Sequence, residues 1–151
     1  MYRSRSSAKP MIIFGSFVLV SVLLILLFFF VPSSQAKKAV DQFYSYEQDA
    51  RYSSSWDMFH PKMQDRFSRN NYMQDRAHVF MNHFGVDTFD YSLGRAKRIK
   101  EWRMTEDGEE LDVYRITVTK SYRGHYGNFK IVKDVFVTKE DGTWMILWDY
   151  K

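Results

Sequence analysis

Apolar and polar positions follow three successive patterns along the chain. Residues 11–31, MIIFGSFVLVSVLLILLFFFV, are apolar at nearly every position, and Ser16 and Ser21 are the only polar side chains among them. In the next stretch, up to about Phe84, apolar residues recur three and four positions apart, which is the period of an amphipathic helix. From Asp87 onward they alternate with polar residues, which is the period of a strand. The patterns therefore predict one long apolar helix, a helical segment and then a β-sheet.

The apolar run is long enough to cross a bilayer once. As a helix, its 21 residues would extend roughly 32 Å, and the hydrocarbon core of a bilayer is about 30 Å thick. Three basic residues and no acid precede the run, so the positive-inside bias places the N-terminus in the cytoplasm. We therefore expect a cytoplasmic stub at 1–10, a transmembrane helix at 11–31 and a domain at 36–151 outside the cytoplasmic membrane.

The junction after the run leaves an alternative open. Lys37 and Lys38 follow the run closely and weaken the charge bias that sets the orientation. Ser34-Gln35-Ala36 is a small-x-small sequence of the kind at which secretory signals are cleaved. The run is longer than the roughly 7 to 15 apolar residues of such a signal, which favours an anchor. Secretion after cleavage near Ala36 is the alternative.

Three helices are expected between the apolar run and the strands. The first is capped by Ser33 or Ser34 and ends near Gln48. The second is divided into two short helices by Pro61, because a proline disfavours the helical conformation of the residue before it. The third, over 71–84, ends before a glycine that suits a left-handed C-terminal cap.

Four long strands are expected in the second half of the chain. The first spans 89–104 and carries a bulge near Gly94, where the apolar positions change parity. The others lie over 110–123, 128–139 and 144–150, and glycine-containing turns separate them. The fold class is therefore α+β, with three helices packed on a strongly bent antiparallel sheet of about four strands.

Composition excludes several functional classes. The chain has no cysteine, which removes disulfides, thiolate metal sites and thiol nucleophiles. The part after the apolar run has 19 basic and 18 acidic residues, so we expect no nucleic acid as a partner, because such a partner requires a basic face. No HExxH, GxSxG or phosphate-loop pattern is present. We expect no metal and no cofactor.

Two blocks resemble the NTF2-like superfamily, the cone-shaped fold of nuclear transport factor 2. Residues 39–61, AVDQFYSYEQDARYSSSWDMFHP, are similar to its opening helix with paired aromatics, acidic turn and short Trp-bearing helix. Residues 140–148, EDGTWMILW, are similar to its Asp-Gly-x-Trp hairpin before the last strand. With the apolar run, the chain resembles small single-span, membrane-anchored NTF2-like proteins of Gram-positive bacteria. The resemblance implies an NTF2-like cone over 36–151.

The resemblance implies two groups of function. Some members of the superfamily are small-molecule enzymes, such as ketosteroid isomerases and scytalone dehydratases, with acid, Tyr or His groups inside the cone. Others are non-catalytic, such as the domain before the transpeptidase in some penicillin-binding proteins and the single-span scaffold subunits of type IV secretion systems. A stub, one span and one outer domain are similar to the second group.

The cone interior is the first candidate site. Asp57 and His60 lie three positions apart on the Trp-bearing helix, where a carboxylate could orient an imidazole for acid-base work. The alternative is that Asp57 lies favourably near a helix start and His60 merely precedes a proline. Large rings are expected either to line a pocket or, more simply, to fill the core. The candidate pocket residues are Phe43, Trp56, Asp57, His60, Tyr114 and Trp148.

The densest basic stretch is the second candidate site. It could meet anionic headgroups or wall polymers, since each nearby charge contributes about 1 kcal/mol at an anionic surface. The alternative is an exposed strand whose cations face Glu109, Glu110 and Asp112 across the hairpin. The basic stretch consists of Arg95, Lys97, Arg98, Lys100 and Arg103.

The sequence supports a binding function better than a catalytic one. We expect a membrane-anchored, non-enzymatic domain that binds a protein or envelope partner at the outer face of the cytoplasmic membrane, or pairs as a homodimer through its open sheet face. A small-molecule enzyme or binder that uses the cone interior is one alternative, and a scaffold subunit of a secretion or conjugation complex is another. A cavity of about 300 Å³ or more with polar groups pointing inward would favour the small-molecule alternative.

Overall fold

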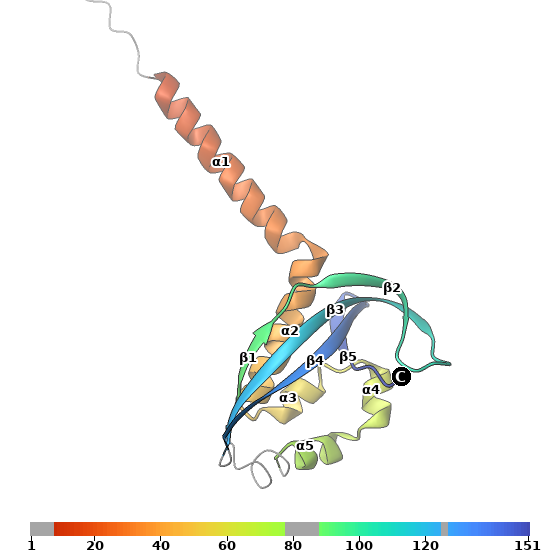
Figure 1. The fold of residues 1–151 in the computed structure, drawn as a ribbon. Coiled ribbons are helices and arrows are strands. Elements are labelled where there is room, and N and C mark those ends of the chain that lie inside the picture. The colour runs from red at the N-terminus through yellow and green to blue at the C-terminus, as the bar shows by residue number, and fades with distance from the viewer. Residues whose placement is uncertain (1–7, 78–87, 125–126) are drawn as a thin grey trace, which may run out of the picture.

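The structure, a computed structural model, describes residues 8–77, 88–124 and 127–151. They form an α+β arrangement in which helices pack against one antiparallel sheet (Figure 1). The elements are α1 (Ala8–Phe30), α2 (Pro32–Gln48), α3 (Tyr52–Trp56), α4 (Pro61–Arg66), α5 (Arg69–Ala77), β1 (Asp90–Leu93), β2 (Lys97–Arg103), β3 (Glu110–Gly124), β4 (Gly127–Glu140) and β5 (Thr143–Leu147).

The sheet is built on the long hairpin of β3 and β4. Its order is β1-β3-β4-β5, and β2 pairs with β3 on the same edge as β1. β1 pairs with the C-terminal half of β3, where Leu93 lies opposite Val118. β2 pairs with the N-terminal half, where Lys97 lies opposite Arg115. The two short strands therefore lie end to end along one edge, and the sheet has five strands rather than four.

The expected bulge near Gly94 is instead a break between two strands. Gly94 N donates to Thr117 O at 2.8 Å, and a Cβ on this glycine would lie 3.3 Å from the same oxygen. The chain is thus held against β3 at Gly94 and then leaves the sheet until β2 begins. The register shift falls later, between Ile99 and Trp102, where Glu101 takes a positive φ of 56°.

The helical predictions are confirmed around Pro61 and shifted elsewhere. α3 and α4 lie on either side of the 57–60 segment, and Pro61 is the first residue of α4. α2 begins at Pro32, which suits the first helical position, so its N-cap is Val31 rather than the expected Ser33 or Ser34, and no side chain caps the helix. α5 begins at Arg69, and the predicted end of this helix near Phe84 lies outside the described residues.

Helix α2 supplies the centre of the core. It contacts β1, β3, β4 and β5, and Ala36, Val40 and Phe43 on one of its faces are fully buried. The segment before α4 closes the free edge of β5: His60 N donates to Ile146 O at 3.0 Å, and Ile146 N donates to Met58 O at 2.9 Å. The edge is therefore paired by the chain itself.

Helix α1 projects away from the sheet (Figure 1). Its apolar side chains between Ile13 and Leu27 are mostly exposed, with Phe14 and Phe17 at 70% and 71%. Among the described residues, no single helix has the length and hydropathy of a membrane span. Ile13–Leu27 and Pro32–Gln48 reach those values only together, as a pair bent by 60°.

Candidate functional site

Two lysines occupy inward positions of the central hairpin. On β3, the buried residues Ile116, Val118, Lys120 and Tyr122 follow each other at every second position. Lys120 is only 8% exposed. On β4, Lys133 stands in the same alternation as Val135. Because neighbouring strands share their faces, both amines are directed to the helix-covered side of the sheet.

These lysines belong to a pocket of about 330 Å³ between the sheet and α5. Its wall combines aromatic rings with three cations, against one carboxylate on the wall, the exposed Asp75. The lining residues are Tyr44, Phe67, Tyr72, Asp75, Arg76, Lys120, Ile131, Lys133 and Trp148. The charge of the described wall is therefore positive.

A buried carboxylate holds one side of this pocket in place. Glu47, 3% exposed near the end of α2, receives hydrogen bonds from Ser55 Oγ and Tyr72 OH, both at 2.6 Å. Its other oxygen forms an ion pair with Arg76 Nε at 3.2 Å. Glu47 thus joins α2 to α3 and α5, and its lone pairs are engaged by these three partners.

The same network fixes the protonation of the pocket wall. Burial alone would lower the pKa of Arg76, but the Glu47 carboxylate raises it beyond its usual range, so the guanidinium stays charged. Burial raises the pKa of Tyr44 and of Tyr72 well above the usual range, and the charge of Glu47 adds to this rise. Both phenols therefore remain protonated donors at neutral pH.

The two lysines are electrostatically strained. Burial, reinforced by repulsion from Arg76, lowers the pKa of Lys120 to about 8, although Glu47 partly opposes the effect. Burial and the charge of Arg76 likewise lower the pKa of Lys133 to about 8. Lys133 lies at the exposed rim of the pocket, and its Nζ lies 4.0 Å from the centre of the Trp148 ring. An anion placed between these cations would relieve their mutual repulsion.

Trp148 forms the aromatic floor of the pocket. Its ring packs edge-on against Phe59 with 5.0 Å between centroids, and the guanidinium of Arg76 lies 5.2 Å from its centre. Its Nε1 is buried and has no hydrogen-bond partner among the described residues. The ring of Trp148 therefore offers an apolar surface to a bound molecule.

The arrangement suits a ligand with an anionic group and a flat apolar body. The cations can bind the charge, and the rings of Phe67, Tyr72 and Trp148 can cover the body. Among the described residues, no group of three His, Asp or Glu side chains is placed to hold a metal ion.

The residues expected to line a pocket are distributed over several places. Trp148 lines the pocket described above, and Tyr114 lines a separate hollow beside Trp144. Phe43 is fully buried in the core. Trp56 is half-buried, and its Nε1 donates to Phe67 O at 2.9 Å. The structure does not bring these four side chains together in one cavity.

Asp57 and His60 have separate partners. Asp57 is exposed and pairs with Arg69 at 2.9 Å. His60 is 4% exposed, and its Nε2 lies 2.8 Å from Glu140 Oε1, while its Nδ1 accepts from Lys62 N at 3.1 Å. Both ring nitrogens of the histidine are therefore engaged, and its carboxylate partner is Glu140 rather than Asp57.

The basic stretch divides into paired and unpaired cations. Arg98 pairs with Asp112 at 2.8 Å, and Arg103 pairs with Glu110, both across the β2–β3 hairpin. Glu109 pairs instead with Lys62 at 2.9 Å. The remaining members of the stretch make no ion pair with a described residue and are exposed: Arg95, Lys97 and Lys100.

Sequence reasoning missed the polar part of the pocket, although a signal was present. Continuing the alternation of Ile116 and Val118 leads to Lys120, and continuing that of Phe129 and Ile131 leads to Lys133. A lysine at an inward strand position is unusual, because lysine is rarely buried without a specific partner.

No protein-family model and no curated protein matches this chain.

Proposed function

We propose that this chain is a membrane-anchored binding domain of the NTF2-like type, and that its pocket binds a small anionic molecule with a flat apolar body. The observation that carries the proposal is that Arg76, Lys120 and Lys133 line one pocket, with Arg76 and Lys133 over the Trp148 ring. The pocket volume of about 330 Å³ lies in the range of small-molecule sites.

A binding role is supported better than a catalytic one. The buried carboxylate next to the pocket, Glu47, is engaged by Ser55, Tyr72 and Arg76. It is therefore not poised to take a proton from a bound molecule. The protein partner, the homodimer and the secretion scaffold expected from the sequence remain predictions.

The charge of the ligand can be tested with two probes that share one apolar body. Naphthalene-2-sulfonate is expected to bind the full-length chain in phosphatidylcholine nanodiscs at least about tenfold more tightly than the neutral naphthalene-2-sulfonamide, since charge-assisted contacts contribute about 1.5 to 3 kcal/mol. Equilibrium dialysis against empty nanodiscs measures both affinities. Equal affinities would contradict an anion site.

Two lysines on opposite faces of β4 give a matched pair of variants. Lys133→Met is expected to reduce sulfonate affinity about tenfold, because it removes one charge at the rim. Lys130→Met removes the same charge from an exposed position of the other face and should leave the affinity unchanged. A similar loss in both variants would show that the probe senses only the net charge of the protein.

Membrane anchoring forms the second part of the proposal. It is supported by the length and composition of residues 11–31 and by the exposed apolar side chains of α1. The helix-covered antiparallel sheet, the paired aromatics of α2 and the hairpin before β5 support the NTF2-like assignment.

Anchoring predicts that the whole chain stays in the membrane fraction after extraction with alkaline carbonate, since an apolar helix of this length is retained by the bilayer. Intact mass spectrometry of the extracted protein gives the N-terminus. Recovery in the soluble fraction of a chain that begins after Ala36 would support the cleaved, secreted alternative instead.

A further inference from the structure

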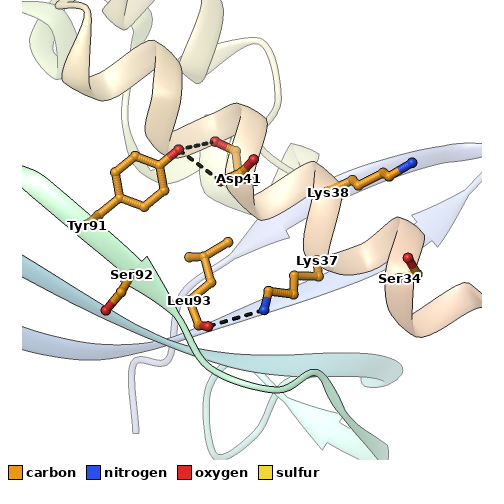
Figure 2. A pocket seen from close by; sticks show the side chains of 7 residues that line it. All are labelled: Ser34, Lys37, Lys38, Asp41, Tyr91, Ser92 and Leu93. Atoms are coloured by element: carbon orange, nitrogen blue, oxygen red, sulfur yellow. Dashed lines mark hydrogen bonds between the residues drawn. The ribbon is translucent and has the colours of Figure 1, made fainter. Parts of the chain in front are cut away.

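Two hollows flank the side chain of Lys37, where α1 meets α2. One, of about 390 Å³, lies between α2 and β1 and is drawn in Figure 2; the other, of about 340 Å³, lies between α2 and the segment after β1. The first is lined by Ser34, Lys37, Lys38, Asp41, Tyr91, Ser92 and Leu93, and the second by Val31, Ser33, Ser34, Lys37, Arg95 and Ala96.

The cations of these hollows form one surface, which we call the entry surface and define as Lys37, Lys38 and Arg95. All three side chains are exposed. The Nζ of Lys37 donates to Leu93 O at 3.3 Å, so its amine lies over the end of β1 (Figure 2). Arg95 lies two residues beyond Leu93 and lines the second hollow together with Lys37.

The acidic groups of the entry surface do not balance its cations. Asp41 is the only acid among the lining residues of the two hollows, and the second hollow has none. The Asp41 carboxylate accepts the Tyr91 hydroxyl at 2.9 Å (Figure 2). Arg95 makes no ion pair with a described residue, in contrast to Arg98 and Arg103 further along the same basic stretch. The entry surface thus carries a net positive charge.

The entry surface lies next to the proposed anchor. Lys37 is separated from Phe30, the last residue of α1, by less than two turns of helix, and the apolar side chains of α1 between Ile13 and Leu27 are exposed. If α1 is in the bilayer, the first turns of α2 lie at the level of the headgroups. The neighbour that is both closest and oppositely charged is then an anionic phospholipid.

We propose that the entry surface binds the headgroups of anionic phospholipids and so fixes the orientation of the domain on the membrane. This inference rests on the proposed anchoring by α1 and not on the ligand of the pocket. Glu47, which supports that pocket, lies 15 residues beyond Pro32 on α2, or roughly 22 Å along the helix. Lipid binding at one end of α2 would hold the pocket at a distance from the bilayer.

Lipid retention by the full-length chain tests this proposal. The chain is reconstituted in nanodiscs of phosphatidylcholine and phosphatidylglycerol in equal amounts, repurified in a mild detergent, and its retained lipids are quantified by mass spectrometry. Phosphatidylglycerol is expected to be enriched severalfold over phosphatidylcholine at low salt. High salt should reduce the enrichment, because exposed charges are screened.

Charge-matched double variants separate the entry surface from net charge. Lys37→Gln with Arg95→Gln is expected to abolish the phosphatidylglycerol enrichment, because each charge near an anionic surface changes the affinity about fivefold. Arg51→Gln with Lys130→Gln removes two exposed cations elsewhere, just before α3 and on β4, and should retain the wild-type enrichment. Circular dichroism establishes that both doubles are folded.

Three outcomes would overturn the inference: no enrichment in the wild type, equal losses in the two doubles, or retention unchanged by Lys37→Gln with Arg95→Gln. A chain that does not remain in membranes at all would overturn the anchoring proposal instead. The carbonate extraction distinguishes these cases, because it does not depend on lipid headgroups.

Discussion

Replacing Glu47 by glutamine is expected to destabilise the domain by about 3 to 5 kcal/mol, the usual effect of removing one partner of a buried ion pair. The carboxylate is 2% exposed and its partner Arg76 is 19% exposed, so the guanidinium would be left with little water to replace the lost charge. The oxygen of the neutral amide can still accept the hydrogen bonds from Ser55 and Tyr72. It cannot neutralise Arg76.

Urea titration of the full-length chain in detergent micelles, followed by tryptophan fluorescence, measures the change in the free energy of unfolding. Asp57→Asn is the control, because it breaks an ion pair of similar length, Asp57 with Arg69, that is about half exposed on both sides. Exposed pairs contribute about 0 to 1 kcal/mol. A loss below about 1 kcal/mol in Glu47→Gln would mean that the Glu47–Arg76 pair does not hold α2 to α5.

A double-variant cycle then assigns the effect to the pair. In the background of Arg76→Met, Glu47→Gln should cost clearly less than it does alone, because no buried cation is left unpaired. Additive losses in the double variant would attribute the effect to the hydroxyl partners Ser55 and Tyr72 instead.

Local chemistry explains which parts of the fold the sequence could predict. The division at Pro61 depends on the steric clash between a proline ring and the residue before it, so it can be predicted without knowing any neighbour. The buried face of α2 follows from the spacing of Ala36, Val40 and Phe43 alone. The alternation in β3 and β4 is equally local.

Contacts between distant residues explain what the sequence could not predict. The break at Gly94 depends on its hydrogen bond to Thr117, and the partner of His60 is Glu140, 80 positions away. An Asp57–His60 pair was one of two interpretations, because the two residues are close in sequence, yet the end of β4 brings a different carboxylate to the histidine.

The pocket could be predicted from the sequence only in part. Glu47 follows the same helical period as Val40 and Tyr44, so its burial could have been predicted, but its partner Arg76 could not, because it depends on how α5 packs. The inward positions of Lys120 and Lys133 follow from strand alternation. Their position in one pocket with Trp148 requires the register of β3 with β4 and the position of the C-terminal segment.

Replacing Lys120 by methionine is expected to stabilise the ligand-free domain and to weaken the binding of naphthalene-2-sulfonate at the same time. The pKa of Lys120 is lowered from 10.5 to about 8, so the folded protein holds a charge at neutral pH that costs on the order of 1 to 3 kcal/mol. Methionine has a similar length and no charge to desolvate. The affinity for the sulfonate should fall about tenfold or more, because a buried cation is removed from the pocket.

The dependence of stability on pH separates this explanation from better packing by methionine. The charged groups around Lys120 are Arg76 on α5, Glu47 on α2 and Lys133 on β4. Below pH about 8 the amine is protonated in both the folded and the unfolded chain, and its full cost is present. Between about 8 and 10.5 the folded protein loses this proton before the unfolded chain does, so wild-type stability rises with pH.

The unfolding free energy of Lys120→Met should therefore exceed that of the wild type, and the difference should be largest at about pH 7. The difference should shrink as the pH rises toward 10, which is the ordinary pKa of tyrosine. The buried tyrosines, whose pKa values are raised, do not contribute to the comparison below that pH. Lys130→Met, which changes an exposed lysine of β4, should remain within about 0.5 kcal/mol of the wild type throughout.

If Lys120→Met is less stable than the wild type at neutral pH, or keeps full affinity for the sulfonate, Lys120 is a structural residue and not part of an anion site. If both changes appear together, the domain gives up stability to keep a cation in its pocket, which is the relation expected of a residue retained for binding.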